Sequence, residues 1–531
     1  MKKIKLRPNQ QKAVDNLLAC FLGQDIEPTG NGKSLIALEC YRRIKEERKV
    51  STWGVIFVHR ILLAKQWIKI AARYLIGQHN MKLHFLNINS SKLSRKVTDD
   101  IEKCMYDAFG PGAPGILSTT NPDDVRTRLQ TLTEKGYSVI VVCTYHSAEV
   151  LEKAKVNFNL KIFDEAHTIV GNKEFQHCHN IHGDKSYFFT ATPRHTSSDN
   201  GAGMNNESIY GPVVHSVSPK EAIRDGTIVA PMVHVIGTEW NPKQEGPIGE
   251  RDYDAYVSMI YYAHGQHEIE IKRRSVEPNN IGAKMLVPCP GQLTLQGIFE
   301  SALFKRMRQE RPHIKVYGLS SDFGIYNDGV YNQKADNSGK EDLLYALYDL
   351  KSSDSAIILH VDMLSEGIDV PGITSMMPLR NFAKDDKFMQ NFGRATRLHP
   401  VDAERIENGE LKLGDWAEYI KPNCHVVLPY CLSESNDFVD RYAMILHVLK
   451  EDYGFDPAQH MVVDILCPAV KPPQWDEDML RKQIRGKVRD DIIGFYYEME
   501  EEGAVIEEIL FRSRFKQSLS ENDTSVVDLL L

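Results

Sequence analysis

The residues with the most specific chemistry form a glycine-rich segment, EPTGNGKS, at positions 27–34. A helix-like stretch, LIALECYRRI, follows it directly, as it follows loops that hold phosphate groups. Glycines let backbone N–H groups converge on an anion, the Lys33 ammonium adds a positive charge, and the Ser34 hydroxyl suits Mg²⁺. A glycine-rich turn without a ligand is the alternative, because Glu27 stands where the strict pattern has its first glycine. The predicted nucleotide-binding residues of this loop are Pro28, Thr29, Gly30, Asn31, Gly32, Lys33 and Ser34.

Two acidic residues follow a second apolar segment, in the sequence LKIFDEAH at 160–167. The apolar part predicts a strand, and open α/β sheets bind ligands at the carboxyl ends of their strands. Adjacent carboxylates at such an end can divide the work: Asp164 as a metal ligand, and Glu165 as the base that activates a water molecule. A solvated turn is the alternative. The position about 130 residues after the glycine-rich loop favours a catalytic pair.

A third group carries positive charge, in the sequence QNFGRATR at 390–397. On a helix Gln390, Arg394 and Arg397 would share one face, because they are four and three residues apart. Two guanidinium groups on one face suit the charge that develops on a transferred phosphoryl group. An exposed basic helix is the alternative if the pattern stands alone.

Short β-branched or aromatic runs alternate with helix-like segments, which predicts parallel sheets with crossover helices. These runs lie at 54–58, 138–143, 160–163 and 186–190, and then at 284–288, 314–318, 356–361, 373–378 and 425–430. Residues 225–251, rich in Pro and Gly, predict a linker. The sequence therefore predicts an α/β protein with two lobes, at 1–228 and 229–432, and an acidic, mostly helical accessory region at 433–531.

Composition is that of an ordinary folded protein, with 42% hydrophobic and 26% charged residues. No apolar run reaches the roughly 18 residues that cross a bilayer, so we expect no membrane span. The nine cysteines are scattered without a CxxC pair, which favours a reducing compartment. The basic start has no apolar stretch behind it, and the LRPNQ motif begins at Leu6, so we expect no secretory signal or presequence and a cytoplasmic protein.

Taken together, eight segments resemble, in order and spacing over about residues 4–432, the motif series of superfamily 2 helicases. They are LRPNQQKAV (6–14), PTGNGKS (28–34), FVHRILLAKQW (57–67), CTYHSAEVL (143–151), DEAH (164–167), TATP (190–193), LSEGIDVP (364–371) and QNFGRATR (390–397). The sequence is most similar to the DNA-acting group that contains UvsW-type phage helicases, XPB, RadD and the motor subunits of restriction enzymes. The resemblance implies two tandem RecA-like lobes that use ATP and Mg²⁺.

The resemblance also implies roles for single residues. Arg7 and Gln10 would contact the adenine, while Gly367 and Asp369 would face the nucleotide from the second lobe. The residues expected to couple the nucleotide site to the nucleic acid, or to lie near its backbone, are Arg60, Thr144, His167, Thr190 and Thr192. The catalytic set would be Lys33, Glu165, Gln390, Arg394 and Arg397.

The resulting hypothesis is an ATP-dependent DNA helicase or translocase that unwinds or remodels branched or duplex DNA. The alternatives are an RNA helicase, a nucleotide-gated binding switch, or a motor subunit of a larger complex. Residues 1–433 carry 53 basic and 51 acidic side chains, which predicts a local basic groove that contacts the backbone with little sequence specificity. From Glu434 onward 11 basic side chains face 21 acidic ones, so we expect residues 433–531 to dock a protein partner or to regulate the motor.

Two further patterns have ordinary explanations. The cluster His177, Cys178, His179 and His182 resembles a metal site, but its irregular spacing favours a polar loop. The basic run RKQIRGKVR at 481–489 is expected to be a solvated helix face, and a patch that contacts the nucleic-acid strand is the alternative.

Overall fold

The computed structural model describes residues 4–88, 116–196, 203–238, 253–320, 325–328, 330–332, 346–361, 370–379, 385–431, 438–457 and 459–466, with isolated positions elsewhere. The described residues form two compact units, one before and one after the junction of Ser218 and Pro219. That junction lies ten residues before the boundary expected from sequence. Helix α9 (Pro219–Arg224) belongs to the second unit, because it packs against α16 (Phe438–Tyr453).

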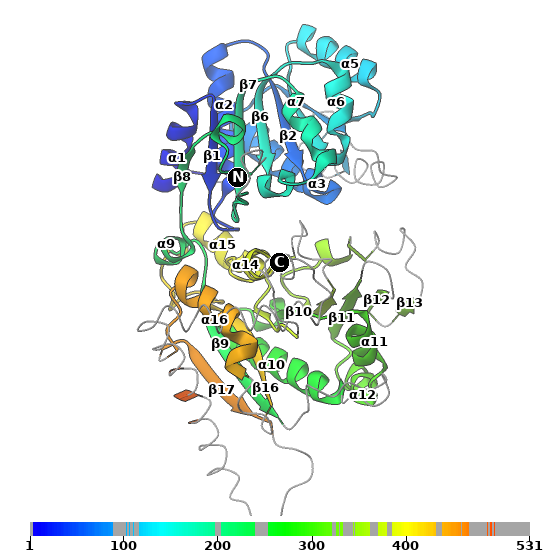
Figure 1. The fold of residues 1–531 in the computed structure, drawn as a ribbon, viewed down its shortest axis with the longest axis vertical. Helices are drawn as coiled ribbons and strands as arrows, with labels where there is room; N and C mark the ends of the chain where they lie inside the picture. Colours follow the sequence, from blue (N-terminus) through cyan, green and yellow to red (C-terminus); the bar gives the residue numbers. More distant parts are fainter. Residues whose placement is uncertain are drawn as a thin grey trace, which may run out of the picture. The chain divides into compact units, whose positions relative to one another are not determined.

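The first unit is built on an eight-stranded parallel sheet with the order β4-β3-β5-β2-β6-β7-β1-β8 (Figure 1). All seven residues of the central strand β5 are buried, as expected for a strand covered on both faces. The strands are β1 (Leu22–Ile26), β2 (Trp53–Val58), β3 (Leu83–Ile88), β4 (Ile116–Ser118), β5 (Ser138–Thr144), β6 (Phe158–Asp164), β7 (Gly183–Thr190) and β8 (Val213–Ser216).

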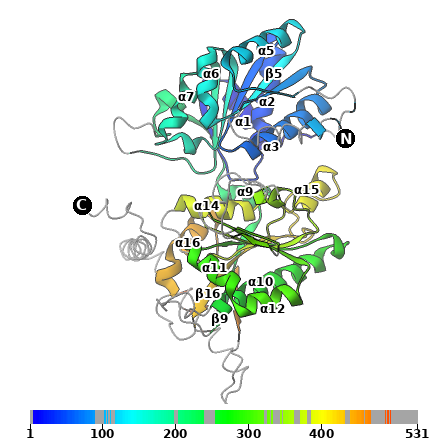
Figure 2. The same cartoon turned by 90° about the vertical axis from the view of Figure 1, so that its right-hand side faces the viewer.

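Helices cover both faces of this sheet. From β1 to β4 the chain moves toward one edge, and from β4 to β8 it moves back, so right-handed crossovers place the two sets of helices on opposite faces. Figure 2 shows α3 on one side and α6 and α7 on the other. The first set is α1 (Pro8–Leu18), α2 (Lys33–Arg48) and α3 (Ile61–Ala71), and the second is α5 (Pro122–Glu134), α6 (Ala148–Ala154) and α7 (His177–Asn180).

The second unit has a nine-stranded sheet with the order β13-β12-β11-β14-β10-β15-β16-β9-β17. It is parallel except for the β11-β12-β13 edge, which is antiparallel. The strands are β9 (Ala230–Thr238), β10 (Lys284–Pro288), β11 (Ile314–Leu319), β12 (Ile325–Asn327), β13 (Val330–Asn332), β14 (Ser355–His360), β15 (Ser375–Met376), β16 (Asn423–Cys431) and β17 (Met461–Ile465).

Helices of the second unit form two groups, and the helices within each group pack against one another. Helix α10 contacts both α11 and α12, and α14 contacts α16. Their bounds are α10 (Tyr253–Arg274), α11 (Gln292–Glu300), α12 (Ala302–Glu310), α14 (Asp385–Ala395) and α15 (Pro400–Glu407). In the described part of the chain, no helix is both long and apolar enough to span a bilayer.

The prediction of an α/β protein with two parallel sheets is confirmed, and every predicted strand segment contains a strand. Two expectations differ from the structure. The predicted linker at 225–251 contains β9, a nine-residue strand that lies between β16 and β17. In the expected accessory region at 433–531, α16 and β17 are parts of the second unit, and the basic run at 481–489 lies almost wholly outside the described residues.

Close packing between β2 and α2 depends on Gly54. A Cβ atom there would lie 2.8 Å from Cε2 of Tyr41, whose fully buried ring is held by a hydrogen bond from its hydroxyl to the Thr52 carbonyl (2.9 Å). We expect Gly54→Ala to lower the free energy of unfolding by about 1–3 kcal/mol, measured by chemical denaturation. The control is Gly291→Ala, where an added Cβ meets nothing within 4 Å. Equal stability of the two variants would contradict the packing described.

Candidate active site

The glycine-rich loop connects the end of β1 to the start of α2. Gly30 and Gly32 both have φ of 95°, in the left-handed region that glycine adopts without strain. At Gly32 a Cβ atom would lie 2.2 Å from Nε2 of Gln10, so a side chain there would displace the Gln10 amide as well as strain the backbone. The loop therefore leads the chain directly into the amino end of a 16-residue helix, where backbone N–H groups attract anions.

Lys33 and two residues of the first motif contact this loop. The buried Lys33 ammonium donates to the carbonyls of Glu27 (2.8 Å) and Pro28 (3.3 Å). Gln10 donates from Nε2 to the Asn31 carbonyl (3.2 Å), and the Arg7 guanidinium donates to the same oxygen. Helix α1 is thus attached to the loop at one carbonyl, and the structure brings Arg7, Gln10 and Lys33 together.

The acidic pair lies at the carboxyl end of β6, and only β7 separates this strand from β1. Asp164 accepts a hydrogen bond from Trp67 Nε1 (2.7 Å), and burial, with the neighbouring Glu165 charge, raises the pKa of Asp164 to about 6. Glu165 has φ and ψ of 50°, a left-handed conformation that costs a non-glycine residue about 1–3 kcal/mol. Strain of this kind is concentrated at functional sites, which supports a role for Glu165 beyond packing.

Thr190 connects the acidic pair to the glycine-rich loop. Its hydroxyl lies 2.8 Å from Nδ1 of His167 and accepts a hydrogen bond from the Thr192 N–H (3.1 Å). The same His167 nitrogen lies 3.5 Å from a Glu165 carboxylate oxygen. On its other side, the Thr190 carbonyl accepts a hydrogen bond from the Glu27 N–H (3.0 Å). A continuous chain of contacts therefore runs from Glu165 to the start of the loop.

Sequence reasoning missed a buried ionic cluster below the loop. Nδ1 of His215, on β8, lies 2.9 Å from an Asp25 carboxylate oxygen and 3.2 Å from one of Glu27. The hydrogen bond to Asp25 and the nearby Glu27 carboxylate raise the pKa of His215 to about 9, so the ring is charged at neutral pH. Glu27 also accepts a hydrogen bond from Asn31 Nδ2 (3.0 Å), and it thereby braces the loop in which it replaces glycine. The only signals in the sequence were two acidic residues, Asp25 just before the glycine-rich loop and Glu27 as its first residue.

Arg60 and Thr144 lie near each other in the sheet topology. Thr144 ends β5, where it pairs in register with Val58 of β2, and Arg60 follows that strand as the N-cap of α3. The Thr144 hydroxyl donates to Ser147 Oγ (3.0 Å). Both residues are therefore at the carboxyl edge of the first sheet, the edge that also carries the loop and the acidic pair.

In the second unit Gln390 and Arg394 lie on α14, one turn apart. The prediction that Arg397 shares their helical face is wrong, because α14 ends at Ala395 and Arg397 forms an antiparallel bridge with Ile228. The buried Lys421 ammonium holds this end of the helix by donating to the carbonyls of Ala395 (2.7 Å) and Arg397. Gly367 and Asp369 lie outside the described residues.

The segment that carries the histidine cluster forms the short helix α7, so the prediction of a polar loop is wrong for His177–Asn180. His179 lies against the rings of Phe163, Phe188 and Tyr210, and burial lowers its pKa to about 4. Nδ1 of His177 lies 2.5 Å from a Glu152 carboxylate oxygen.

The first unit combines a parallel α/β sheet with a phosphate-type loop and a DEAH pair at one edge, and a second, largely parallel sheet follows it, as the resemblance to superfamily 2 helicases implies. Residues 3–195 match the family described as "Type III restriction enzyme, res subunit". The resemblance to superfamily 2 helicases, with restriction-enzyme motors among the relatives, is therefore confirmed. No curated protein sequence matches the chain.

Two solved structures are similar to the chain in fold. The ATP-dependent Type ISP restriction-modification enzyme LlaBIII bound to DNA aligns with a TM-score of 0.55 and 17% identity, over 92% of this chain and 33% of that one. A nuclease-deletion mutant of the Type ISP enzyme LlaGI with a DNA substrate mimic aligns with a TM-score of 0.51 and 17% identity, over 92% and 31%. The chain thus spans about a third of the length of these proteins, and at this identity the likeness shows the fold alone.

The charge on His215 makes stability depend on pH. Because its folded pKa of about 9 exceeds the ordinary 6.5, the stabilisation is fully present below pH 6.5 and is lost as pH rises through 9. We expect the free energy of unfolding to fall by up to about 3 kcal/mol across this range, measured by urea denaturation. His215→Gln should flatten the profile, whereas His182→Gln, at an exposed position, should not. An equally steep decline in His215→Gln would contradict the cluster's role.

Proposed function

We propose that the protein is an ATP-dependent DNA translocase or helicase that unwinds or remodels duplex or branched DNA. The observation that carries this proposal is the contact chain from Glu165 through His167 and Thr190 to the loop at Glu27. Through these contacts, a nucleotide bound at the glycine-rich loop would influence the position of Glu165, the residue proposed to activate water. Together with the match of residues 3–195 to a restriction-enzyme motor family, this contact chain supports a nucleotide-driven motor.

The residues of the first unit fit a Mg²⁺-bound nucleoside triphosphate. Left-handed Gly30 and Gly32 leave the loop N–H groups free of side-chain obstruction, and the Lys33 ammonium already lies among the loop carbonyls. Ser34, the second residue of α2, has a hydroxyl suited to the metal. A buried carboxylate with a raised pKa, such as Asp164, gains stability from a nearby cation, so it fits the role of metal ligand.

In this proposal Glu165 accepts a proton from the attacking water. Nδ1 of His167 lies 3.5 Å from a Glu165 carboxylate oxygen, so the charge of that carboxylate would affect the His167 ring. Arg394 and Arg397, with Gln390, would stabilise the charge on the transferred phosphoryl group from the second unit. Arg397 has a backbone held by the β-bridge to Ile228 and by Lys421, so its position does not depend on the helix. Arg7 and Gln10 would contact the base, and Gly367 and Asp369 the nucleotide.

DNA is proposed as the substrate because the family match and both similar structures come from restriction enzymes, and both structures contain DNA or a mimic of it. Arg60 and Thr144, at the carboxyl edge of the first sheet, would contact the nucleic-acid backbone. Since the chain spans only about a third of these enzymes, a motor subunit of a larger assembly is the second candidate. The acidic region 433–531 would then dock a protein partner in the cytoplasm.

Two substitutions test the chemistry. We expect Lys33→Ala to lower ATP turnover at least about 100-fold, because the outer phosphates lose a fixed positive charge. Glu165→Gln should lose about 10²–10⁴-fold in turnover yet still bind ATP, because the metal ligand Asp164 remains. Steady-state ATPase assays and binding of a fluorescent nucleotide measure the two effects. Lys12→Ala and Glu134→Gln, both exposed in the same unit, are the matched controls. Normal turnover by Lys33→Ala would overturn the assignment of the loop.

The nature of the polymer is tested by comparing ATP turnover alone and with single-stranded DNA, forked DNA or RNA. We expect stimulation by DNA, weakening with added salt and varying little with sequence, because contacts to phosphates release counterions without reading bases. Greater stimulation by RNA would favour the RNA helicase. Turnover that no nucleic acid stimulates would favour the nucleotide-gated switch.

A further inference from the structure

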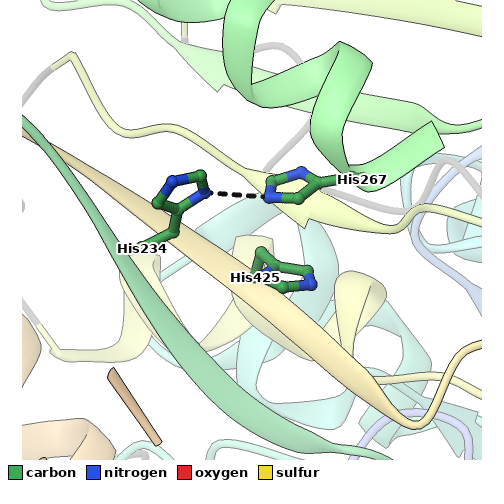
Figure 3. A group of neighbouring side chains, drawn as sticks. All are labelled: His234, His267 and His425. Carbon is green, nitrogen blue, oxygen red and sulfur yellow. Dashed lines mark hydrogen bonds between the residues drawn. The ribbon is translucent and has the colours of Figure 1, made fainter. Parts of the chain in front are cut away.

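Three histidines from distant parts of the chain meet in the second unit (Figure 3). His234 lies on β9, His425 on the neighbouring strand β16 and His267 on α10. His425 pairs in register with Met232, so it shares a sheet face with His234, because alternate residues of a strand point to the same side. Each ring offers one nitrogen, and these three nitrogens lie within 4.8 Å of one another.

Two carboxylates set which ring nitrogens are available. Nε2 of His234 donates to Asp464 (2.9 Å), and Nε2 of His425 donates to Glu270 (3.0 Å). A ring that donates from Nε2 presents the lone pair of Nδ1, and carboxylates in this outer position commonly orient metal-binding histidines. Asp464, on β17, pairs in register with Ile236, two residues from His234, and Glu270 lies one turn after His267 on α10.

The nitrogen freed in this way on His425 is not satisfied by any protein group that the structure describes. Nδ1 of His425 is enclosed and has no hydrogen-bond partner among the described residues. A buried polar atom without a partner costs about 1–3 kcal/mol. A cation would use the Nδ1 lone pair of His425, to which no group in the described part of the chain donates.

The spacing agrees with a tetrahedral ion. Nδ1 of His234 lies 3.2 Å from Nε2 of His267. With zinc–nitrogen bonds of about 2.0–2.1 Å, two tetrahedral ligand atoms lie about 3.3–3.4 Å apart. His425 stacks on His267 with ring centroids 4.0 Å apart, and its nitrogen lies within 4.8 Å of the other two.

An ion could reach this point from a cavity of about 380 Å³. The three histidines, Glu270 and Asp464 line it, together with Arg273 and Arg274. Imidazole nitrogens suit Zn²⁺, and three protein ligands with a cavity beside them leave a fourth position for water or a small anion.

We propose that His234, His267 and His425 form a binding site for a divalent transition-metal ion, best suited to Zn²⁺, with Asp464 and Glu270 orienting two of the ligands. The ion would link α10 to β9 and β16, and through Asp464 to the edge strand β17. This site is separate from the loop and the acidic pair, and it does not depend on the function proposed for them.

The test uses the full chain, with any affinity tag removed, stripped with a chelator and titrated with Zn²⁺ in a calorimeter. We expect about one ion per chain, a higher unfolding temperature with Zn²⁺, and an intense visible absorption when Co²⁺ replaces it. His425→Ala should abolish the tight site. Asp464→Asn, which keeps all three ligands and spares the core, should weaken binding about 10–100-fold.

His313→Ala, an exposed histidine of the same unit, is the control and should bind as the unaltered chain does. Circular dichroism verifies that each variant is folded. No binding by the unaltered chain, or binding that Asp464→Asn and His425→Ala leave undiminished, would overturn the proposal and leave the cluster as a hydrogen-bonded histidine pair.

Discussion

Strand β7 lies between β1 and β6 and pairs with both in parallel, and the organisation of the first unit depends on this pairing. Parallel strands present their carboxyl ends at one edge, so the loop after β1 and the acidic pair after β6 must lie on the same side. Thr190, the last residue of β7, occupies the gap and contacts both neighbours. A single residue at a strand end can therefore connect the two halves of the candidate site.

Buried charge sets the second constraint on this edge. Glu27 replaces a loop glycine with a carboxylate that must be neutralised, and His215 supplies the opposite charge from β8. Asp25 on β1 also pairs with the His215 cation, so the first residue of the loop, Glu27, belongs to a buried ionic cluster. Asn31, within the loop, adds a hydrogen bond to the Glu27 carboxylate. The departure from the usual loop sequence is accommodated by partners on the adjacent strand.

In the second unit, the point at which helix α14 ends determines the position of Arg397. Helix α14 stops at Ala395, where Lys421 donates to the exposed carbonyls and Ile228 pairs with Arg397. The arginine is thereby placed on extended backbone with two independent supports. Strand β9 is a full strand inside the segment where Pro and Gly predicted a linker, and it carries His234, one of the three clustered histidines.

The sequence by itself determined the alternating α/β pattern, the glycine-rich loop and the acidic pair. These features depend on residues that are neighbours in the sequence. They are apolar runs that form strands, closely spaced glycines, and two carboxylates at the end of an apolar run. Only the tertiary structure decided which strands adjoin, and with that the contacts between residues far apart in the chain. The pairing of His215 with Asp25, the end of α14, and the meeting of His234, His267 and His425 arise from sheet order and burial, which no local pattern encodes.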